Sequence, residues 1–163
     1  ISLSDGTTTV STLFTVSITA TNDAPTLAAV SAGYTDTAAE DTFTPTTGTL
    51  VGGDADAGQS ITYGLLGGTD DGVKVTTVGT YGTLQVVTAT GAYTYTPNAT
   101  AINQRTANAT DTFTITATDG VVASPTTNTV TVSITGVNDT PTLATPTTAT
   151  FTDTPAKIGR AHV

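Results

Sequence analysis

Residues 129–135 read Thr-Val-Thr-Val-Ser-Ile-Thr, and this strict alternation of polar and apolar residues decides the fold class. Successive side chains of a β-strand point to opposite faces, so Val130, Val132 and Ile134 should share one face and the hydroxyl residues the other. β-Branched residues also pack well on a pleated surface. The stretch therefore predicts a strand that buries one face in a core.

Similar alternating stretches recur along the chain, separated by turn residues. Helix formers are scarce, since Glu40 is the only glutamate. Short, regularly spaced strands of this kind predict an all-β Greek-key sandwich of about seven strands, with a loop at residues 98–110. The expected inner-face residues are Leu50, Val51, Ile61, Tyr63, Leu65, Val73, Val75, Leu84, Val86, Val87, Tyr93, Tyr95, Phe113, Ile115 and Ala117.

The chain also repeats itself. The stretch Thr-Val-Ser-Ile-Thr at residues 15–19 returns at residues 131–135, and Asn-Asp-Ala-Pro-Thr-Leu at residues 22–27 returns at the same offset as Asn-Asp-Thr-Pro-Thr-Leu. Further on, Tyr-Thr-Asp-Thr at residues 34–37 matches Phe-Thr-Asp-Thr at residues 151–154. Self-similarity at a fixed period is the sequence signature of a tandem array.

The repeat boundaries divide the chain into four parts. Residues 1–21 are expected to be the C-terminal strands of a preceding repeat, residues 22–137 a complete repeat, and residues 138–156 the start of the next. The correspondence ends there. Residues 157–163, Lys-Ile-Gly-Arg-Ala-His-Val, are what a common sequencing adapter encodes, so we expect a non-native tail of adapter read-through.

Composition excludes several functions. The formal charge of −9 disfavours binding to nucleic acid or to anionic membrane surfaces, and no apolar run is long enough for membrane insertion. There is no cysteine, and the single histidine, His162, lies in the suspect tail, so thiol chemistry and a Ser-His-Asp triad are not expected. No phosphate-binding loop is present. We expect no enzyme activity and no catalytic residue.

Three groups of residues together resemble a known family: residues 114–120 with 129–134, the Val-Asn-Asp-Thr-Pro at residues 137–141, and Tyr-Thr-Tyr-Thr-Pro-Asn at residues 93–98. They are similar to the bacterial cadherin-like and VCBS-type repeats of large RTX-type adhesins. The resemblance covers nearly the whole chain except the tail. It implies an immunoglobulin/cadherin-like sandwich in a head-to-tail array, with Ca²⁺ held where adjacent repeats meet.

The resemblance also implies the calcium ligands. At the first junction these are Asn22, Asp23, Asp54, Asp56 and Asp119. At the second junction they are Glu40, Asn138 and Asp139. The chain departs from the family pattern because Ala20 and Gly136 stand where the linker motif usually opens with aspartate, and the Asp-Arg-Glu triplet is missing.

The spacing of Asp54 and Asp56 supports this assignment independently. In extended chain their carboxylates lie on the same side, about 6–7 Å apart, where they repel unless a cation lies between them. Ca²⁺ prefers six to eight oxygen ligands, largely carboxylates. The alternative is that residues 54–58 form only a solvated acidic turn. Likewise, residues 70–72 favour a hairpin turn over a metal site, and the tyrosines favour the core over a sugar-stacking platform.

These observations predict a calcium-stiffened extender repeat of a large secreted adhesin at the bacterial cell surface. Its partners would be the neighbouring repeats of the same chain, with host or cell-surface glycans or proteins bound through other domains. Two alternatives stay open. The repeat could be a carbohydrate- or protein-binding sandwich module, or an accessory domain of a secreted hydrolase.

Overall fold

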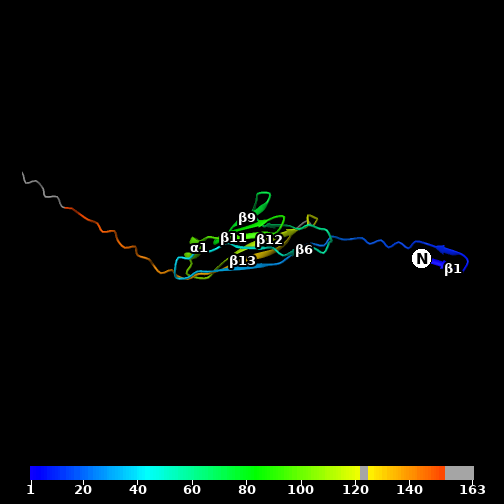
Figure 1. The fold of residues 1–163 in the computed structure, drawn as a ribbon, viewed down its shortest axis with the longest axis horizontal. Helices are drawn as coiled ribbons and strands as arrows, with labels where there is room; N and C mark the ends of the chain where they lie inside the picture. The colour runs from blue at the N-terminus through cyan, green and yellow to red at the C-terminus, as the bar shows by residue number, and fades with distance from the viewer. Residues whose placement is uncertain (122–124, 153–163) are drawn as a thin grey trace, which may run out of the picture.

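The computed structural model describes residues 1–121 and 125–152, so the suspect tail at residues 157–163 lies outside the described residues. Its main body is an elongated β-sandwich (Figure 1). The N-terminal segment extends from one end of the sandwich and the C-terminal segment from the other. The predicted all-β sandwich is confirmed.

One layer is a five-stranded antiparallel sheet in the order β5-β11-β10-β9-β8. Its central strand, β10, alternates buried and partly buried residues, which is the pattern of a sheet with one covered face. The strands are β5 (Thr46–Thr49), β8 (Thr69–Asp70), β9 (Lys74–Val78), β10 (Gly82–Val87) and β11 (Ala92–Pro97).

The other layer is a four-stranded sheet in the order β4-β13-β12-β7. The pairs β12·β13 and β12·β7 are antiparallel, whereas β4 and β13 pair in parallel. The first and last long strands of the sandwich are therefore direct neighbours. The strands are β4 (Val30–Thr35), β7 (Thr62–Leu65), β12 (Ala109–Thr118) and β13 (Thr126–Thr135).

Two short pairings complete the strands: β1 (Ser2–Ser4) with β2 (Thr9–Ser11), and β3 (Thr26–Leu27) with β6 (Gly52–Gly53). The expected loop at residues 98–110 is wrong in part, because it contains the helix α1 (Ala99–Asn103). The Asn98 side chain caps this helix by accepting a 3.2 Å hydrogen bond from the Ala101 N–H. Within the described ranges, no helix is long and apolar enough to cross a membrane.

The core lies between the two sheets and is built mainly from the predicted inner faces. Leu84, Val86 and Tyr95 of one sheet meet Ile115, Ala117, Val130, Val132 and Ile134 of the other, and all are at most 1% exposed. Val51 and Val87 are corrections, because Val51 is 69% exposed and Val87 lies on the opposite face of β10 from the buried Val86. Val73 is a further correction, since it is 65% exposed. The backbone N–H of Val73 donates to Asp71 in the turn before β9. Val73 therefore precedes the strand, although the alternation had assigned it to the inner face of that strand.

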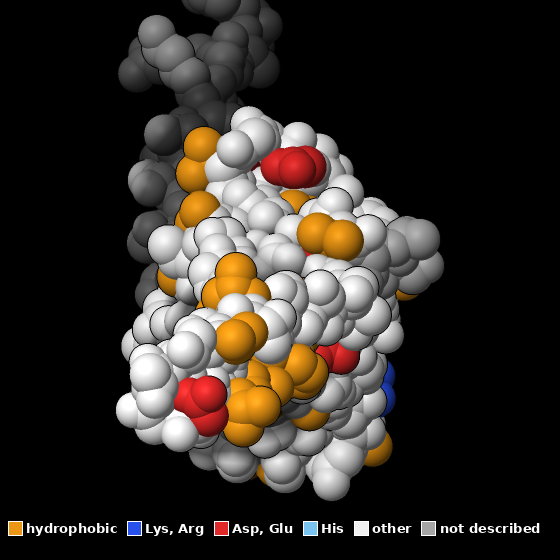
Figure 2. Space-filling view, turned by 90° about the vertical axis from the view of Figure 1, so that its right-hand side faces the viewer, with side chains coloured by type: hydrophobic (Ala, Val, Ile, Leu, Met, Phe, Trp, Pro, Cys, Tyr) orange, Lys and Arg blue, Asp and Glu red, His pale blue; other side chains and the backbone are white. Residues whose placement is uncertain are grey.

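Residues 1–21 are exposed throughout and carry several apolar side chains, including Phe14, Val16 and Ile18. Figure 2 views the molecule from this end and shows hydrophobic side chains gathered on the surface. Val16 and Ile18 correspond in sequence to Val132 and Ile134, which are buried in the complete sandwich. An incomplete neighbouring repeat would explain this exposure, and that assignment stays a prediction.

Candidate metal centres at the two ends of the sandwich

The first junction, defined as Asn22, Asp23, Asp54, Asp56 and Asp119, lies at the end of the sandwich where the N-terminal segment enters. Pairing of β3 with β6 places the acidic turn beside the linker, because Thr26 opposes Gly53 and its hydroxyl donates to the Gly53 carbonyl at 3.0 Å. Asp119 follows β12 at the same end.

Hydrogen bonds connect all five predicted residues of the first junction. The Asn22 side-chain amide donates to Oδ2 of Asp119 at 2.7 Å. The backbone N–H of Asp23 donates to Oδ2 of Asp56, also at 2.7 Å, and the backbone N–H of Asp56 donates to Oδ1 of Asp54 at 2.8 Å. The structure thus brings these residues together although they come from three distant parts of the sequence.

Some carboxylate oxygens of the first junction accept hydrogen bonds, whereas one oxygen of Asp54 accepts none from the described part of the chain. Oδ2 of Asp54 is buried and has no hydrogen-bond partner among the described residues. A shallow hollow of about 280 Å³ lies beside the cluster, between residues 20–22 and residues 56–59. A buried carboxylate oxygen without a donor is costly, and a bound cation would remove that cost.

The second junction, predicted as Glu40, Asn138 and Asp139, lies at the opposite end, where the structure adds Asp36 and Asp41 to it. Asp36 directly follows β4 and is only 1% exposed. Its backbone N–H donates to the Thr135 carbonyl at 2.9 Å, and its Oδ2 accepts from the Val137 N–H at 3.2 Å. Asp36 therefore ties the end of the first strand to the chain leaving the last one.

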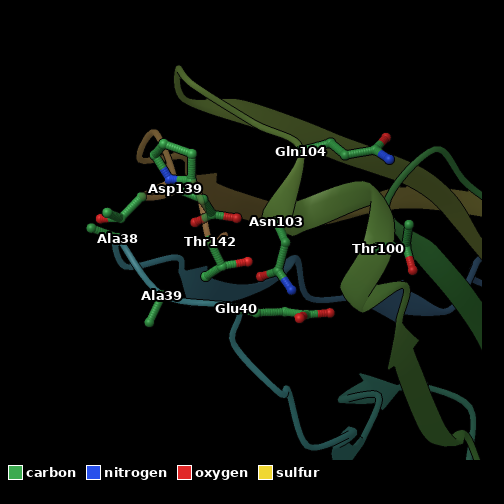
Figure 3. Close-up of a pocket in the computed structure, with 10 residues that line it drawn as sticks. Ala38, Ala39, Glu40, Thr100, Asn103, Gln104, Asp139 and Thr142 are labelled. Carbon is green, nitrogen blue, oxygen red and sulfur yellow. The ribbon is translucent and has the colours of Figure 1, made fainter. Parts of the chain in front are cut away.

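Asp41 is held in the loop that follows. Its Oδ2 accepts from the Thr37 N–H at 2.6 Å, and its backbone exchanges two hydrogen bonds with the side chain of Asn103 on α1. An open hollow of about 550 Å³ lies between this loop, α1 and residues 139–142. Figure 3 shows the Glu40 side chain extending beneath α1 and Asp139 on the linker side of the hollow.

The carboxylates of the second junction repel one another. Desolvation raises the pKa of the Asp139 carboxyl above its ordinary value, and the charges of Asp36, Asp41 and Glu40 raise that pKa further. Oδ1 of Asp36 and Oδ1 of Asp139 are both buried, and neither has a hydrogen-bond partner in the described part of the chain. This cluster favours the binding of a cation.

Neither junction is a preformed metal site. Over residues 1–121 and 125–152, no three acidic or histidine side chains converge as a ready set of metal ligands. At the first junction, N–H groups instead hold the carboxylates of Asp56 and Asp119. An ion coordinated by these two Oδ2 oxygens would replace the hydrogen bonds donated by Asn22 and Asp23.

The sequence reasoning missed Asp36 and Asp41. Asp36 lies in the Tyr-Thr-Asp-Thr stretch at residues 34–37 that returns at residues 151–154, so the repeat itself carried a signal for it. Asp41 adjoins Glu40, which was predicted. Neither signal indicates burial, and it is the burial of Asp36 beside Asp139 that strengthens the second cluster.

In the acidic turn at residues 70–72, unlike the two junctions, the carboxylates accept hydrogen bonds from the turn's own backbone. Oδ1 of Asp70 accepts from the Gly72 N–H at 2.8 Å, and Oδ1 of Asp71 accepts from the N–H groups of Val73 and Lys74. These bonds lower the pKa of Asp71. Both carboxylates thus stabilise the turn, in agreement with the hairpin interpretation.

Comparison with known protein families identifies the segment predicted to be a complete repeat. The sequence profile of the bacterial cadherin-like domain matches residues 22–136. The chain belongs to this family. A search of the curated proteins found no match. Family membership indicates an extracellular, adhesion-type module, and cadherin-like domains generally bind Ca²⁺.

The structure also explains why Gly136 stands where the linker motif of this family usually has aspartate. A Cβ atom at Gly136 would lie 2.6 Å from the Arg105 Cβ and 2.6 Å from the Ala107 carbonyl oxygen. No real Cβ tolerates such a distance. A side chain at this position, an aspartate included, would therefore require the loop after α1 to shift. The carboxylates of the second junction come from residues 36–41 and 139 instead.

Proposed function

We propose that this cadherin-like domain is a calcium-stiffened extender repeat of a large secreted adhesin at the cell surface. The observation that carries the proposal is the placement of two acidic clusters at opposite ends of one sandwich. Each cluster combines residues of the sandwich with residues of the linker that enters or leaves it. An ion bound at either end would therefore join the sandwich to its linker.

The donor types fit calcium. Ca²⁺ takes six to eight oxygen ligands from carboxylates, amide or backbone carbonyls and water. Asp36, Glu40, Asp41, Asn138 and Asp139 would supply such oxygens at the second junction, and the five residues of the first junction would supply them at the other end. The buried oxygens of Asp36, Asp54 and Asp139 support this assignment, because each lacks a hydrogen-bond donor among the residues described.

Calcium would supply the positive charge that these clusters lack. In its absence the carboxylates of the second junction repel, and the linker at residues 138–140 is held by few contacts, one of them the 3.1 Å bond from the Thr140 N–H to the Ala38 carbonyl. Extracellular calcium modules bind with dissociation constants of about 10⁻⁴–10⁻³ M. An ion at a hundred times its dissociation constant adds about 2.7 kcal/mol per site, which is a large part of a domain's stability.

A sugar-binding module is a weaker proposal, because the tyrosines do not form an exposed platform. Tyr95 is 1% exposed, and Tyr63 and Tyr93 pack against the core. Gly48 and Gly52 lie directly beneath the rings of Tyr93 and Tyr63, respectively. These aromatic rings thus fill space over glycines within the sandwich. An accessory role in a secreted hydrolase stays an alternative that the flanking sequence would decide.

The proposal is tested by thermal unfolding during calcium titration, with EDTA as the reference. We expect the melting temperature to rise through the millimolar range. Asp54→Ala/Asp56→Ala and Asp36→Asn/Asp139→Asn should each lose part of that rise. The matched control is Asp70→Asn/Asp71→Asn, which removes the same formal charge at a turn and should keep the full response. Identical melting curves with and without calcium would remove the metal from the proposal.

A further inference from the structure

The first and last strands of the sandwich form one continuous contact. All six residues of β4 pair in parallel with β13, from Val30 opposite Val130 to Thr35 opposite Thr135. The two partners lie about as far apart in sequence as this sandwich allows. Closing such a contact fixes the path of nearly the whole domain.

Side chains extend this contact beyond both ends of β4. On one side, the Thr126 hydroxyl donates to the Pro25 carbonyl at 2.6 Å, and the Asn128 amide donates to the Leu27 carbonyl at 2.9 Å. On the other side, Asp36 bonds Thr135 and Val137 as described above. Each of these three side-chain hydrogen bonds joins two residues that are 101 positions apart in sequence. The two segments therefore keep the same register at both ends of the contact.

One face of the contact is buried, whereas Ser31, Gly33 and Thr35 of the edge strand β4 face solvent. Pro25 and Asp36, which mark its two ends on the first segment, are both among the fully buried residues. On the second segment, Val130, Val132 and Ile134 are at most 1% exposed. The contact is therefore anchored by buried groups at both ends and along its inner face, where a broken hydrogen bond leaves polar groups unsatisfied.

The direction of loading follows from the topology. The chain enters the sandwich before Pro25 at the first junction and leaves after Val137 at the opposite end (Figure 1). Tension between these ends pulls β4 and β13 in opposite directions along their own axes. All hydrogen bonds of the pair then carry the load together. If both strands were pulled from the same end, the bonds would break one after another.

We propose that residues 25–36 and 126–137 form a shear clamp that resists unfolding under tension along the chain. Its biological use rests on the proposed function, since an extender repeat transmits the pull between an adhesive tip and the cell. Thr126, Asn128 and Asp36 are positioning residues that lengthen the clamp beyond the backbone ladder. Asp36 also belongs to the second junction, so an ion bound there would act on the same end of the clamp.

Force spectroscopy on single molecules tests the clamp by its geometry. The chain has no cysteine, so two introduced thiols define the pulling points uniquely. Thr21→Cys/Ala144→Cys pulls the clamp in shear. Thr21→Cys/Thr127→Cys pulls both segments from the same end and peels them apart. In EDTA we expect a severalfold higher unfolding force for the shear pair at the same loading rate. Equal forces would overturn the proposal.

A second comparison separates the clamp from general stability. In the shear geometry, Thr126→Val/Asn128→Ala should raise the unfolding rate under load about tenfold, because two hydrogen bonds are lost. The control Thr94→Val/Asn108→Ala makes the same chemical changes outside the clamp and should leave that rate unchanged. If both double variants change the rate in proportion to their melting temperatures, the clamp is refuted.

Repeating both pulling geometries with calcium in place of EDTA distinguishes this inference from the proposed function. A shear-to-peel difference that persists in EDTA and does not change with calcium would support the clamp and contradict calcium stiffening. A force that rises with calcium equally in both geometries, without any difference between them in EDTA, would support calcium stiffening and overturn the clamp.

Discussion

The hydroxyl of Tyr95 donates a 3.0 Å hydrogen bond to Oδ2 of Asp111, and both side chains are buried in the core. Asp111 also accepts from the backbone N–H groups of Thr80 and Tyr81, at 3.0 and 2.8 Å. This carboxylate joins the strand β12 of one sheet to the turn between β9 and β10 and to β11 of the other. It is a polar link between the two layers of an otherwise apolar sandwich.

Tyr95→Phe should lower the free energy of unfolding by about 1.5–3 kcal/mol, since a hydrogen bond to a charged group is lost inside the core. The ring itself and its contacts with Tyr34 and Phe113 are kept. Denaturant unfolding measures the change. Tyr93→Phe removes a hydroxyl from a half-buried ring of the same strand and should cost less. Equal losses for both variants would contradict the assigned role of Asp111.

Asp111→Ala should cost about 3 kcal/mol or more, because it leaves three donors without their acceptor. Asp111→Asn keeps the shape and one acceptor oxygen, so it should retain part of the lost stability. The measurement is again the free energy of unfolding by denaturant. A loss below about 1 kcal/mol for the alanine variant would mean that water replaces the carboxylate easily.

Asp139→Asn should raise the melting temperature in EDTA at neutral pH. The pKa of Asp139 is raised, so the folded chain holds this proton more tightly than the unfolded chain does. The stability that the group contributes is present below about pH 3.8 and is lost as pH rises through the folded pKa. As the pH rises from about 3.8 through the folded pKa, the melting temperature of Asp139→Asn should therefore fall less than that of the wild type.

Asp71 should show the opposite pH dependence of stability. Its pKa is lowered by N–H donors, so its contribution is present above pH 3.8 and is lost as pH falls through the folded pKa. Asp71→Asn should not raise the melting temperature at neutral pH. An equal rise in both variants would indicate a general effect of net charge instead of local repulsion at the second junction.

Gly136→Asp should destabilise the domain by about 1–3 kcal/mol, because the new side chain overlaps the Arg105 Cβ and the Ala107 carbonyl. It restores an acid to the linker, yet it should not strengthen calcium binding if the loop after α1 must move to admit it. The matched control is Ala20→Asp, at the corresponding and exposed position of the other linker. Calcium titrations with denaturant unfolding compare the two, and a harmless Gly136→Asp would contradict the steric argument.

Much of the sandwich could be predicted from alternation alone. Val130, Val132 and Ile134 are buried as expected, because the side-chain period of a strand directly assigns its faces. Val73 failed, since alternation does not show where a turn ends and a strand begins. The helix α1 was missed for a similar reason. A single turn with one buried residue, Ile102, is too short to leave a helical period in the sequence.

The candidate sites were only partly predictable. The residues of the first junction were predicted from short motifs that match the family resemblance, and the fold brings these motifs together, while their role as calcium ligands stays a prediction. Asp36 lies in the repeated stretch at residues 34–37, but that stretch does not indicate that its side chain is buried. Its importance depends on parallel pairing of β4 with β13, a contact between segments about 100 residues apart, which no local pattern reveals. The same contact places Asp36, whose charge contributes to the raised pKa of Asp139.

The parallel pairing of β4 with β13 has one more consequence. Because the chain enters and leaves at opposite poles, copies of this unit joined in series would lie end to end and would not fold back on one another. The reach of such a molecule then grows in proportion to the number of copies, so each duplication of the coding unit lengthens it by one sandwich. The pull on every copy stays the same however many are added, and the weakest copy sets the strength of the whole.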